Sequence, residues 1–176
     1  MVKDKVILGI LRREGGWVDD PQDSGGETNY GITIGTARRY GYMGPMRELT
    51  QAQAYHIYAE QYWNSLRLDD IARHSEKVAE ELADTAVNMG VRRAGIFLQR
   101  SLNVLNKNGR LYDDLVVDGR IGPASLRAFN KYIVRRDEIV LFRMLNCLQG
   151  AFYVELAERR RKDERFVYGW FLNRVS

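Results

Sequence analysis

The sequence predicts a mainly α-helical protein with one small β-hairpin lobe beside the end of its first helix. Apolar residues recur at helical spacing along most of the 176 residues. Serine, threonine and glycine stand at the expected starts and ends of these segments, as helix caps do. One stretch, residues 14–33, breaks the pattern with glycine, proline, serine and acidic residues. The non-helical lobe is therefore expected there.

The first predicted helix covers Val2–Glu14 and ends at Gly15 and Gly16. Its last turn carries a carboxylate, Glu14, at the helix end that bears partial negative charge. That field favours the protonated form of Glu14, and so does partial burial. A carboxylic acid that stays protonated near neutral pH is what a general acid requires. Glu14 is therefore the first candidate catalytic residue.

Residues 15–33 add further carboxylates and a predicted hairpin. The acidic residues of this stretch are Asp19, Asp20, Asp23 and Glu27. Residues 29–33 form a predicted short strand or tight turn that folds back over the helix end. Two carboxyl groups on facing elements are the minimum machinery of glycoside hydrolysis. The alternative is that these acids are solvated turn residues, above all Asp20, which precedes Pro21. Thr28 and Asn29, on the hairpin, either position a water molecule or serve only turn and strand chemistry.

The rest of the chain is predicted to be helical. The expected helices cover residues 34–40, 50–65, 76–89, 91–105, 124–132, 137–161 and 166–175. Residues 69–74 are expected to be a connector, and residues 115–117 a brief extended run. The second of these helices is rich in aromatic residues, namely Tyr55, Tyr58, Tyr62 and Trp63. Such a stripe usually packs in a core, and the alternative is a platform for sugar rings, with Tyr62 and Trp63 joined by Asn29 and Tyr30 of the hairpin.

Composition narrows the class of protein. The net charge of +4 attracts the chain to polyanions, which include nucleic acid, anionic membranes and cell wall. The basic residues are spread along the chain and do not cluster on one helix face, so no nucleic-acid partner is expected. A single cysteine, Cys147, excludes an intrachain disulfide and is expected to be a buried apolar residue. His56 and His74 are too few and too isolated for a metal site, so no metal and no cofactor are expected.

The stretch EGGWVDDPQDSGGETNYGIT, residues 14–33, resembles the signature of glycoside hydrolase family 108. That family comprises phage and prophage endolysins and related bacterial muramidases, and it is similar to the lysozyme-like superfamily, in which a helix-terminal Glu precedes a small β-lobe. The resemblance implies that Glu14 is the catalytic acid. Asp23 follows Glu14 by nine residues, a spacing similar to that of the two carboxylates of phage-type lysozymes. Asp23 is therefore the first choice for the second carboxylate, Asp20 the second and Glu27 the third.

The later part of the chain resembles the peptidoglycan-binding half of the same family. Residues 117–126, VDGRIGPASL, are similar to its DGxxGPxT core, and residues 166–175, FVYGWFLNRV, to its FxxGWxxR segment. The resemblance implies a lysozyme-like catalytic half, residues 1–90, and a helical peptidoglycan-binding-like half, residues 91–176, packed as one compact body. Because Gly119, Pro123 and Trp170 suit turns and packing, the second half is expected chiefly to complete the fold.

The expected function is that of a monomeric N-acetylmuramidase that cleaves the β-1,4 bond between N-acetylmuramic acid and N-acetylglucosamine of peptidoglycan. The sequence leaves open a lytic transglycosylase, and a non-catalytic wall-binding or secretion-assisting protein of the same fold. A degenerate binder would be expected to lose Glu14, which is present. The N-terminus lacks the features of a signal peptide, and no transmembrane segment is expected. The enzyme is therefore expected to wait in the cytoplasm until a factor such as a holin releases it.

Overall fold

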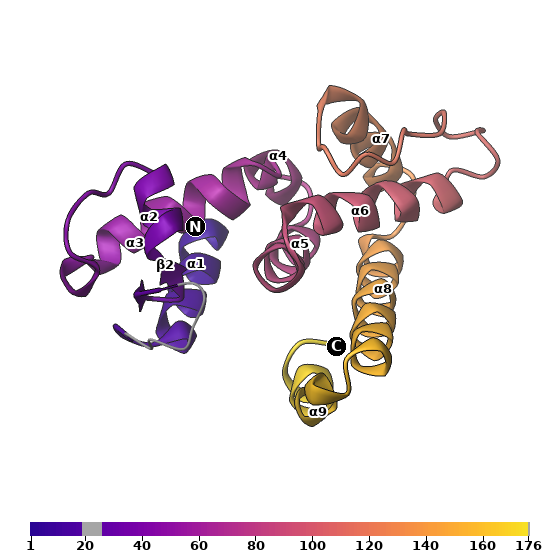
Figure 1. Ribbon diagram of the computed structural model, residues 1–176. Helices are drawn as coiled ribbons and strands as arrows, with labels where there is room; N and C mark the ends of the chain where they lie inside the picture. Colours follow the sequence, from indigo (N-terminus) through magenta and orange to yellow (C-terminus); the bar gives the residue numbers. More distant parts are fainter. Residues whose placement is uncertain (19–25, 176) are drawn as a thin grey trace. The chain divides into compact units, whose positions relative to one another are not determined.

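The computed structural model describes residues 1–18 and 26–175. It separates into two compact units, Met1–Asn64 and Ser65–Ser176. Both units are mainly helical, and the first also contains a two-stranded antiparallel hairpin (Figure 1). The predicted fold class, mainly α with one small β-hairpin lobe next to the end of the first helix, is confirmed.

The first unit contains the elements that the irregular N-terminal stretch and the aromatic helix predict. They are α1 (Val2–Glu14), β1 (Thr28–Asn29), β2 (Ile32–Thr33), α2 (Ile34–Arg39), η1 (Met46–Glu48), α3 (Gln51–Tyr58) and η2 (Ala59–Asn64). Thr33 caps α2, and Thr50 and Gln53 form a reciprocal capping box at the start of α3. The aromatic helix changes to a π-helical segment, η2, at Ala59. The caps that the sequence predicts therefore begin both helices.

Helix α1 packs against α3 and η2 through an apolar face that includes Ile7, Ile10 and Leu11, all buried. Two polar contacts fix its first turn. The Tyr55 hydroxyl donates to the Asp4 carboxylate at 2.6 Å, and the Lys3 ammonium donates to Asn64 at 2.9 Å. The Tyr55 hydrogen bond is the main cause of the lowered pKa of Asp4. Helix α1 is therefore held both by its apolar face and by polar contacts of its first turn.

The hairpin is short but held on several sides. Its strands pair Thr28 with Thr33 and Asn29 with Ile32. Both turn residues have positive φ, 51° at Tyr30 and 69° at Gly31, which suits the right-handed twist of a two-residue hairpin. Tyrosine rarely adopts such a backbone conformation. The turn is held in place because the Tyr58 hydroxyl of α3 donates to the Tyr30 carbonyl at 3.1 Å.

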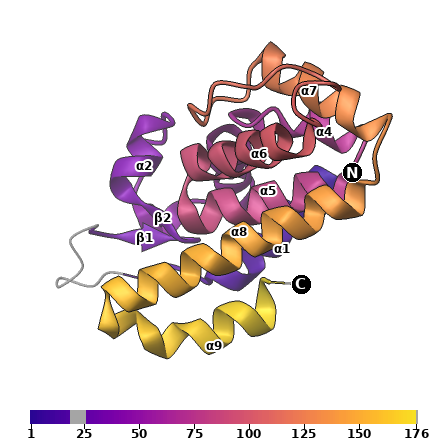
Figure 2. The ribbon, with the colours of Figure 1, turned by 90° about the vertical axis from the view of Figure 1, so that its right-hand side faces the viewer.

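The second unit is helical throughout its regular elements. These are α4 (Leu68–Ala72), α5 (Glu76–Met89), α6 (Val91–Leu105), α7 (Pro123–Ile133), α8 (Glu138–Arg159), η3 (Arg161–Asp163) and α9 (Glu164–Asn173). Helix α6 lies between α5 and α7, and α8 runs beside α9 (Figure 2). An irregular segment, residues 106–122, connects α6 to α7; residues 115–117, which were expected to be briefly extended, belong to no strand in the described chain.

Helix α4 was predicted as a connector, and that prediction is wrong. Leu68 and Ile71 are fully buried, so this short turn has an apolar face that the second unit covers. Arg67 precedes it in the left-handed conformation, and its guanidinium pairs with Asp70 at 2.8 Å. Burial of the two apolar residues stabilises a helix that is too short for sequence periodicity to reveal.

Helix α8 differs from its prediction in which residues it buries. Leu141 and Leu145 are buried, and the polar residues Asn146 and Gln149 are buried as well. Cys147 falls on the other side of the helix and is exposed, so the expectation that it is buried is wrong. Helix α8 is long and apolar enough to cross a membrane. Length and composition alone are weak evidence for a membrane span, because the core helices of many proteins have the same length and composition. Helix α8 packs against α5, α6 and α9.

Helix α9 was expected to pack its aromatic residues on a helical core, and it does so only in part. Trp170 is half-buried and stacks on Tyr153 of α8 with ring centroids 4.6 Å apart. Phe166 and Phe171 remain 44% and 40% exposed. No described residue of α9 is fully buried. The helix is therefore attached to α8 mainly through one aromatic stack and through the contacts of its C-terminal end.

Candidate active site

The candidate acid Glu14 is the last residue of α1, as the sequence predicts. Gly15 follows with φ 77°, a left-handed conformation that suits glycine and ends the helix. The chain then extends to Val18, which forms an antiparallel bridge with Thr28 through two backbone hydrogen bonds of 2.8 Å. This bridge joins the segment that leaves α1 to strand β1. The hairpin is thereby fixed beside the end of the helix that carries Glu14.

The candidate partners of Glu14 fall in different parts of the chain. Asp19, Asp20 and Asp23 lie outside the described residues. Glu27 is half-buried immediately before β1, and its carbonyl accepts a hydrogen bond from the Ile34 backbone at 2.9 Å. Thr28 lies in β1, opposite Val18. Glu27 and Thr28 are therefore held next to the segment that follows Glu14, while the choice of second carboxylate remains a prediction.

Two candidate substrate-binding residues of the hairpin have structural contacts. Asn29 is only 4% exposed, and its side-chain amide donates to the Met46 carbonyl at 2.7 Å. This hydrogen bond joins β1 to η1 and gives Asn29 an anchoring role. Tyr30 is half-buried at the tip of the hairpin, where its carbonyl accepts from Tyr58. Of the two residues, Tyr30 is the one whose side chain has surface open to a ligand.

The aromatic stripe divides into a core residue and a partly exposed one. Trp63 is 1% exposed and lies in the core of the first unit, so neither face of its indole is open to a sugar ring. Tyr62 is half-buried and lies against Tyr58, with ring centroids 5.3 Å apart. Because Tyr58 also holds Tyr30, the structure brings Tyr30 and Tyr62 to the same residue. Of the two aromatic residues of this helix predicted to contact sugar, Tyr62 is therefore the one with exposed surface, and sugar binding by Tyr30 and Tyr62 stays a prediction.

Comparison with known families adds to this geometry. Residues 7–90 match the family described as glycosyl hydrolase 108. The first half of the chain is a glycosyl hydrolase 108 domain. The match includes Glu14, the hairpin, and α4 and α5 of the second unit. Residues 93–175 match the family described as a predicted peptidoglycan domain. The protein is thus a glycoside hydrolase with a peptidoglycan-binding domain, and peptidoglycan is the ligand that this second domain indicates.

The fold also has a counterpart among solved structures. The chain is similar to the structure of Brucella abortus SagA, with 29% sequence identity and a TM-score of 0.69. The similarity covers 96% of this chain and 86% of that one. No curated protein matches the chain significantly. The arrangement of helices in the glycosyl hydrolase 108 domain and in the domain after it therefore has a counterpart over nearly the whole length.

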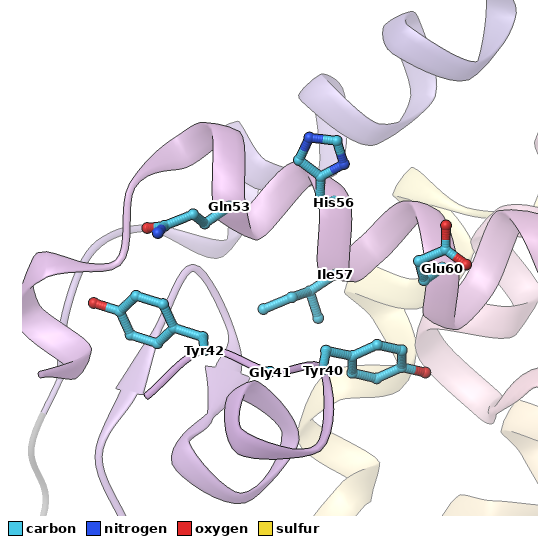
Figure 3. Close-up of a pocket in the computed structure, with 7 residues that line it drawn as sticks. All are labelled: Tyr40, Gly41, Tyr42, Gln53, His56, Ile57 and Glu60. Atoms are coloured by element: carbon cyan, nitrogen blue, oxygen red, sulfur yellow. The ribbon is translucent and has the colours of Figure 1, made fainter. Parts of the chain in front are cut away.

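The glycosyl hydrolase 108 domain also contains a pocket that sequence reasoning missed. It has a volume of about 230 Å³ and lies between the end of α2 and α3. Ile57 lies between the rings of Tyr40 and Tyr42, and Gln53, His56 and Glu60 complete the lining (Figure 3). Apolar ring faces and hydrogen-bonding groups together suit a small polar ring. The sequence did carry a signal, because Gln53, His56 and Glu60 recur at i, i+3 and i+7.

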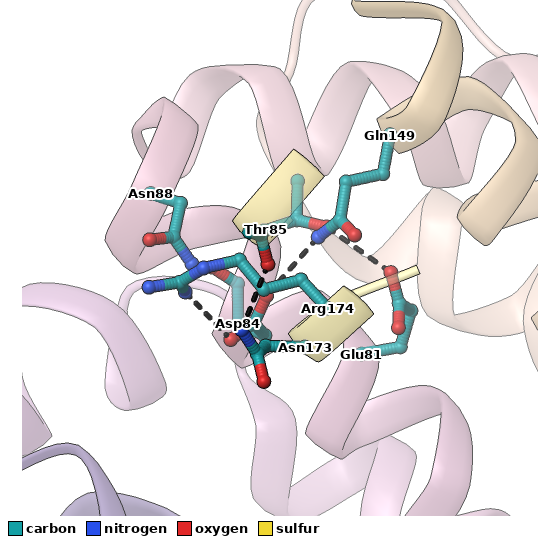
Figure 4. Close-up of polar contacts among 8 residues, drawn as sticks. Glu81, Asp84, Thr85, Asn88, Gln149, Asn173 and Arg174 are labelled. Atoms are coloured by element: carbon teal, nitrogen blue, oxygen red, sulfur yellow. Dashed lines mark hydrogen bonds and ion pairs between the residues drawn. The ribbon is translucent and has the colours of Figure 1, made fainter. Parts of the chain in front are cut away.

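A second group of titratable residues is centred on α5, which belongs to the segment that matches glycosyl hydrolase 108. Glu81 is 6% exposed, and burial raises its pKa to about 8, with the nearby Asp84 charge as the second cause. Asp84 accepts from Gln149 of α8 at 3.1 Å and pairs with Arg174 beyond α9 at 3.3 Å (Figure 4). Glu81 is therefore uncharged near neutral pH. The sequence signal was a carboxylate on the apolar stripe of α5.

This second group serves packing. Its residues come from α5, from α8 and from Arg174 just after α9. The Thr85 hydroxyl joins Glu81 and Gln149 with contacts of 3.5 and 3.2 Å. Arg174 lies in the segment 166–175, one residue after the position of the arginine in the FxxGWxxR pattern, which is Asn173 here. Its pairing with Asp84 gives Arg174 a structural role. Within the parts of the chain that the structure describes, no group of three or more His, Cys, Asp or Glu side chains is placed to hold a metal ion.

Proposed function

We propose that this protein is a peptidoglycan N-acetylmuramidase, with Glu14 as the general acid that protonates the oxygen of the leaving sugar. The observation that carries the proposal is the position of Glu14 as the last residue of α1, beside a fixed hairpin, within the segment that matches glycosyl hydrolase 108. A carboxyl group at that end of a helix is favoured in its protonated form. The substrate bond is the β-1,4 bond between N-acetylmuramic acid and N-acetylglucosamine.

In this mechanism the second carboxylate comes from the loop after Glu14. Asp23 is the first choice, and Asp20 and Glu27 are the alternatives. The second carboxylate either activates a water molecule or stabilises the positive charge that develops on the sugar. Thr28 pairs with Val18, which lies in the segment that follows α1. Thr28 is therefore our candidate for positioning such a water. Tyr30 and Tyr62 supply ring faces on which a sugar can stack.

The experiment that tests the proposal replaces Glu14 by glutamine. The amide is nearly isosteric with the acid but cannot donate a proton to the leaving oxygen. Hydrolysis of purified sacculi, followed by turbidity, should fall by at least ~10²-fold, which is the usual scale of general acid catalysis. The free energy of unfolding should change by less than about 1 kcal/mol, because Glu14 is the last residue of its helix. A Glu14→Gln variant with near-normal lytic activity would overturn the assignment.

The products that the unmodified protein releases from sacculi distinguish a muramidase from a lytic transglycosylase. A hydrolase leaves a reducing N-acetylmuramic acid at the new end of the glycan, whereas a transglycosylase leaves an anhydro sugar. Mass spectrometry of the released fragments distinguishes them because the anhydro product is lighter by one water. We expect the reducing end.

A further inference from the structure

The second unit contains a hollow that has no assigned role. It lies between the start of α6 and the segment Asp118–Gly122, and its volume is about 710 Å³. Arg92, Asp118, Gly119, Arg120 and Ile121 are among its lining residues. We call it the Arg92–Arg120 cavity. Arg120 and Ile121 belong to the segment VDGRIGPASL that the sequence singles out, while Arg92 falls between the two matched family segments, residues 7–90 and 93–175.

The wall of this cavity is fixed by the backbone. Gly119 has φ 81° and packs so closely on α6 that a Cβ on Gly95 would collide with its carbonyl oxygen. The buried amide of Gln99 fastens the segment further. Its oxygen accepts from the Gly119 backbone at 2.7 Å, and its nitrogen donates to the Arg120 carbonyl at 3.0 Å. The backbone that carries Arg120 is therefore held firmly before any ligand arrives.

Among the described residues that line the cavity, Asp118 is the one carboxylate, and it already has partners. Asp118 Oδ1 accepts from Gln99 at 2.9 Å and from the Arg120 backbone at 2.8 Å, and the Gln99 hydrogen bond is the main cause of its lowered pKa. Arg92 and Arg120 are both exposed, and among the described residues neither guanidinium forms a hydrogen bond or an ion pair. By contrast, Arg67 and Arg174 of the same unit are paired with aspartates. The cavity wall thus offers two unpaired guanidinium groups.

Two guanidinium groups beside apolar side chains favour the binding of a planar anion. A guanidinium matches a carboxylate in shape and can donate two parallel hydrogen bonds to it, which an ammonium cannot do. Val91 and Ile121 supply apolar surface in the same wall. A ligand that fits carries carboxylates on a short, partly apolar chain.

We propose that the Arg92–Arg120 cavity binds the free carboxylates of peptidoglycan stem peptides. This inference rests on peptidoglycan being the substrate, and it assigns to the second domain a ligand group distinct from the sugars cleaved near Glu14. The glycan strand offers hydroxyl and amide groups, whereas the stem peptides carry the free carboxylates. The second domain therefore recognises the peptide that branches from the strand.

The test measures binding of two soluble ligands to the full chain by calorimetry. One ligand is a disaccharide that carries a tetrapeptide stem, and the other is the same molecule with its peptide carboxylates converted to amides. A disaccharide without peptide would not serve, because its N-acetylmuramic acid carries a free lactyl carboxylate. The variants are Arg92→Gln, Arg120→Gln and the double substitution. Each single change should weaken binding of the peptide-bearing ligand about tenfold, the effect of losing one charge-assisted hydrogen-bonding partner. Binding of the amidated ligand should not change. The affinity of the unmodified protein for the peptide-bearing ligand should fall as salt is added.

Arg100→Gln is the matched control, because it removes the same charge from an exposed position further along α6, outside the cavity. It should bind both ligands like the unmodified protein. The inference is overturned if the double variant binds the peptide-bearing ligand normally, if Arg100→Gln weakens binding equally, or if the amidated ligand loses affinity to the same extent. Circular dichroism of each variant shows whether the fold is intact.

A second readout separates this inference from the proposed catalytic function. On glycan strands whose stem-peptide carboxylates have been amidated, the double variant should keep its rate of hydrolysis, whereas Glu14→Gln should lose it. If Glu14→Gln stays active, the catalytic assignment fails while the binding result for the cavity still stands. If the double variant binds normally, the cavity assignment fails and the catalytic one is untouched.

Discussion

The acidic residues after Glu14 are not equivalent candidates, because their local sequences differ. Asp20 precedes Pro21 and suits the start of a turn, whereas Glu27 sits next to β1 and can brace the hairpin. Asp23 has neither role in sequence. Substitution by alanine at each position should therefore lower the rate of sacculus hydrolysis most at Asp23, then at Asp20, and least at Glu27. Equal and small losses at all three positions would mean that Glu14 works largely alone.

The stereochemistry of the product gives an independent check on the second carboxylate. A pair of carboxyl groups about 5 Å apart implies retention of the anomeric configuration, whereas about 6.5–9.5 Å leaves room for an inverting water. Proton NMR of the sugar released early in the reaction distinguishes the two. An Asp23→Ala variant that keeps both the rate and the stereochemistry would assign the role to another residue.

Glu81 makes stability depend on pH in a direction that its environment determines. In the folded protein its pKa is raised to about 8, and the ordinary value is 4.5. The folded state therefore holds a proton that the unfolded chain releases, so Glu81 favours folding below about pH 4.5 and this contribution is lost as the pH rises toward about 8. The full loss is on the order of a few kcal/mol.

We expect Glu81→Gln to remove this part of the pH dependence, since an amide does not titrate. Thermal denaturation at pH 5 and at pH 8 should show a larger fall in Tm for the unmodified protein than for the variant. Glu158→Gln, at an exposed position of α8, serves as the control and should behave like the unmodified protein. Parallel melting curves for Glu81→Gln and the unmodified protein would show that Glu81 ionises as it does in water.

At the scale of elements, α9 shows how a helix can be attached without a buried face. Its main aromatic contact is the stack of Trp170 on Tyr153, and its end is tied down by Arg174 on Asp84. Trp170→Ala should therefore destabilise the protein by about 1–3 kcal/mol, less than the ~3–5 kcal/mol of a fully buried tryptophan. Urea denaturation measures the change. A loss of 4 kcal/mol or more would indicate that the indole is covered more completely than the half-burial described.

The exposed aromatic residue Tyr168 provides the comparison for that experiment. It lies on the same helix and is 80% exposed. Tyr168→Ala should change the free energy of unfolding by less than about 0.5 kcal/mol, as substitutions at exposed positions usually do. Comparable losses at Tyr168 and Trp170 would mean that the Tyr153 stack contributes little.

At the scale of the whole molecule, the family boundary and the packing boundary do not coincide. The match to glycosyl hydrolase 108 ends at residue 90, but α4 and α5 pack in the unit that begins at Ser65. Helix α5 contacts both α6 and α8, and its buried apolar face comprises Val78, Ala79, Leu82, Ala83 and Ala86. The polar ties from Gln149 and Arg174 to Asp84 cross the family boundary too.

We therefore expect a fragment of residues 65–176 to unfold cooperatively on heating and a fragment of residues 91–176 to be unstable or to aggregate. The shorter fragment lacks α5 and exposes the apolar surfaces of α6 and α8 that α5 covers. Residues 1–90 alone should also aggregate, because they would expose the apolar face of α5. Circular dichroism melts and size-exclusion chromatography of the three fragments test this. A stable fragment 91–176 that binds sacculi like the full chain would make it an independent targeting domain.

The sequence by itself determined the features that depend on local chemistry. Capping at Thr33, Thr50 and Ser75 and the glycines after α1 and α5 place helix ends within a few residues, because caps act on backbone groups nearby. The position of Glu14 at a helix end follows from the same local rules. The hairpin was predictable for the same reason, because the local sequence of residues 29–33 indicates a short strand or tight turn. In the structure, Tyr30 and Gly31 form the turn between the two-residue strands β1 and β2.

Only the tertiary structure decided which side chains are buried and which polar groups meet. Asn29 and Trp63 were candidates for sugar binding, and their burial depends on η1 and α1, which are remote in sequence. The pKa of Glu81 is raised by burial and by the nearby charge of Asp84. Arg92 and Arg120 line one cavity, whose wall is formed where Gly119 approaches Gly95 closely. Burial and charge pairing depend on distances between residues far apart in the chain, and periodicity along one segment carries no information about those distances.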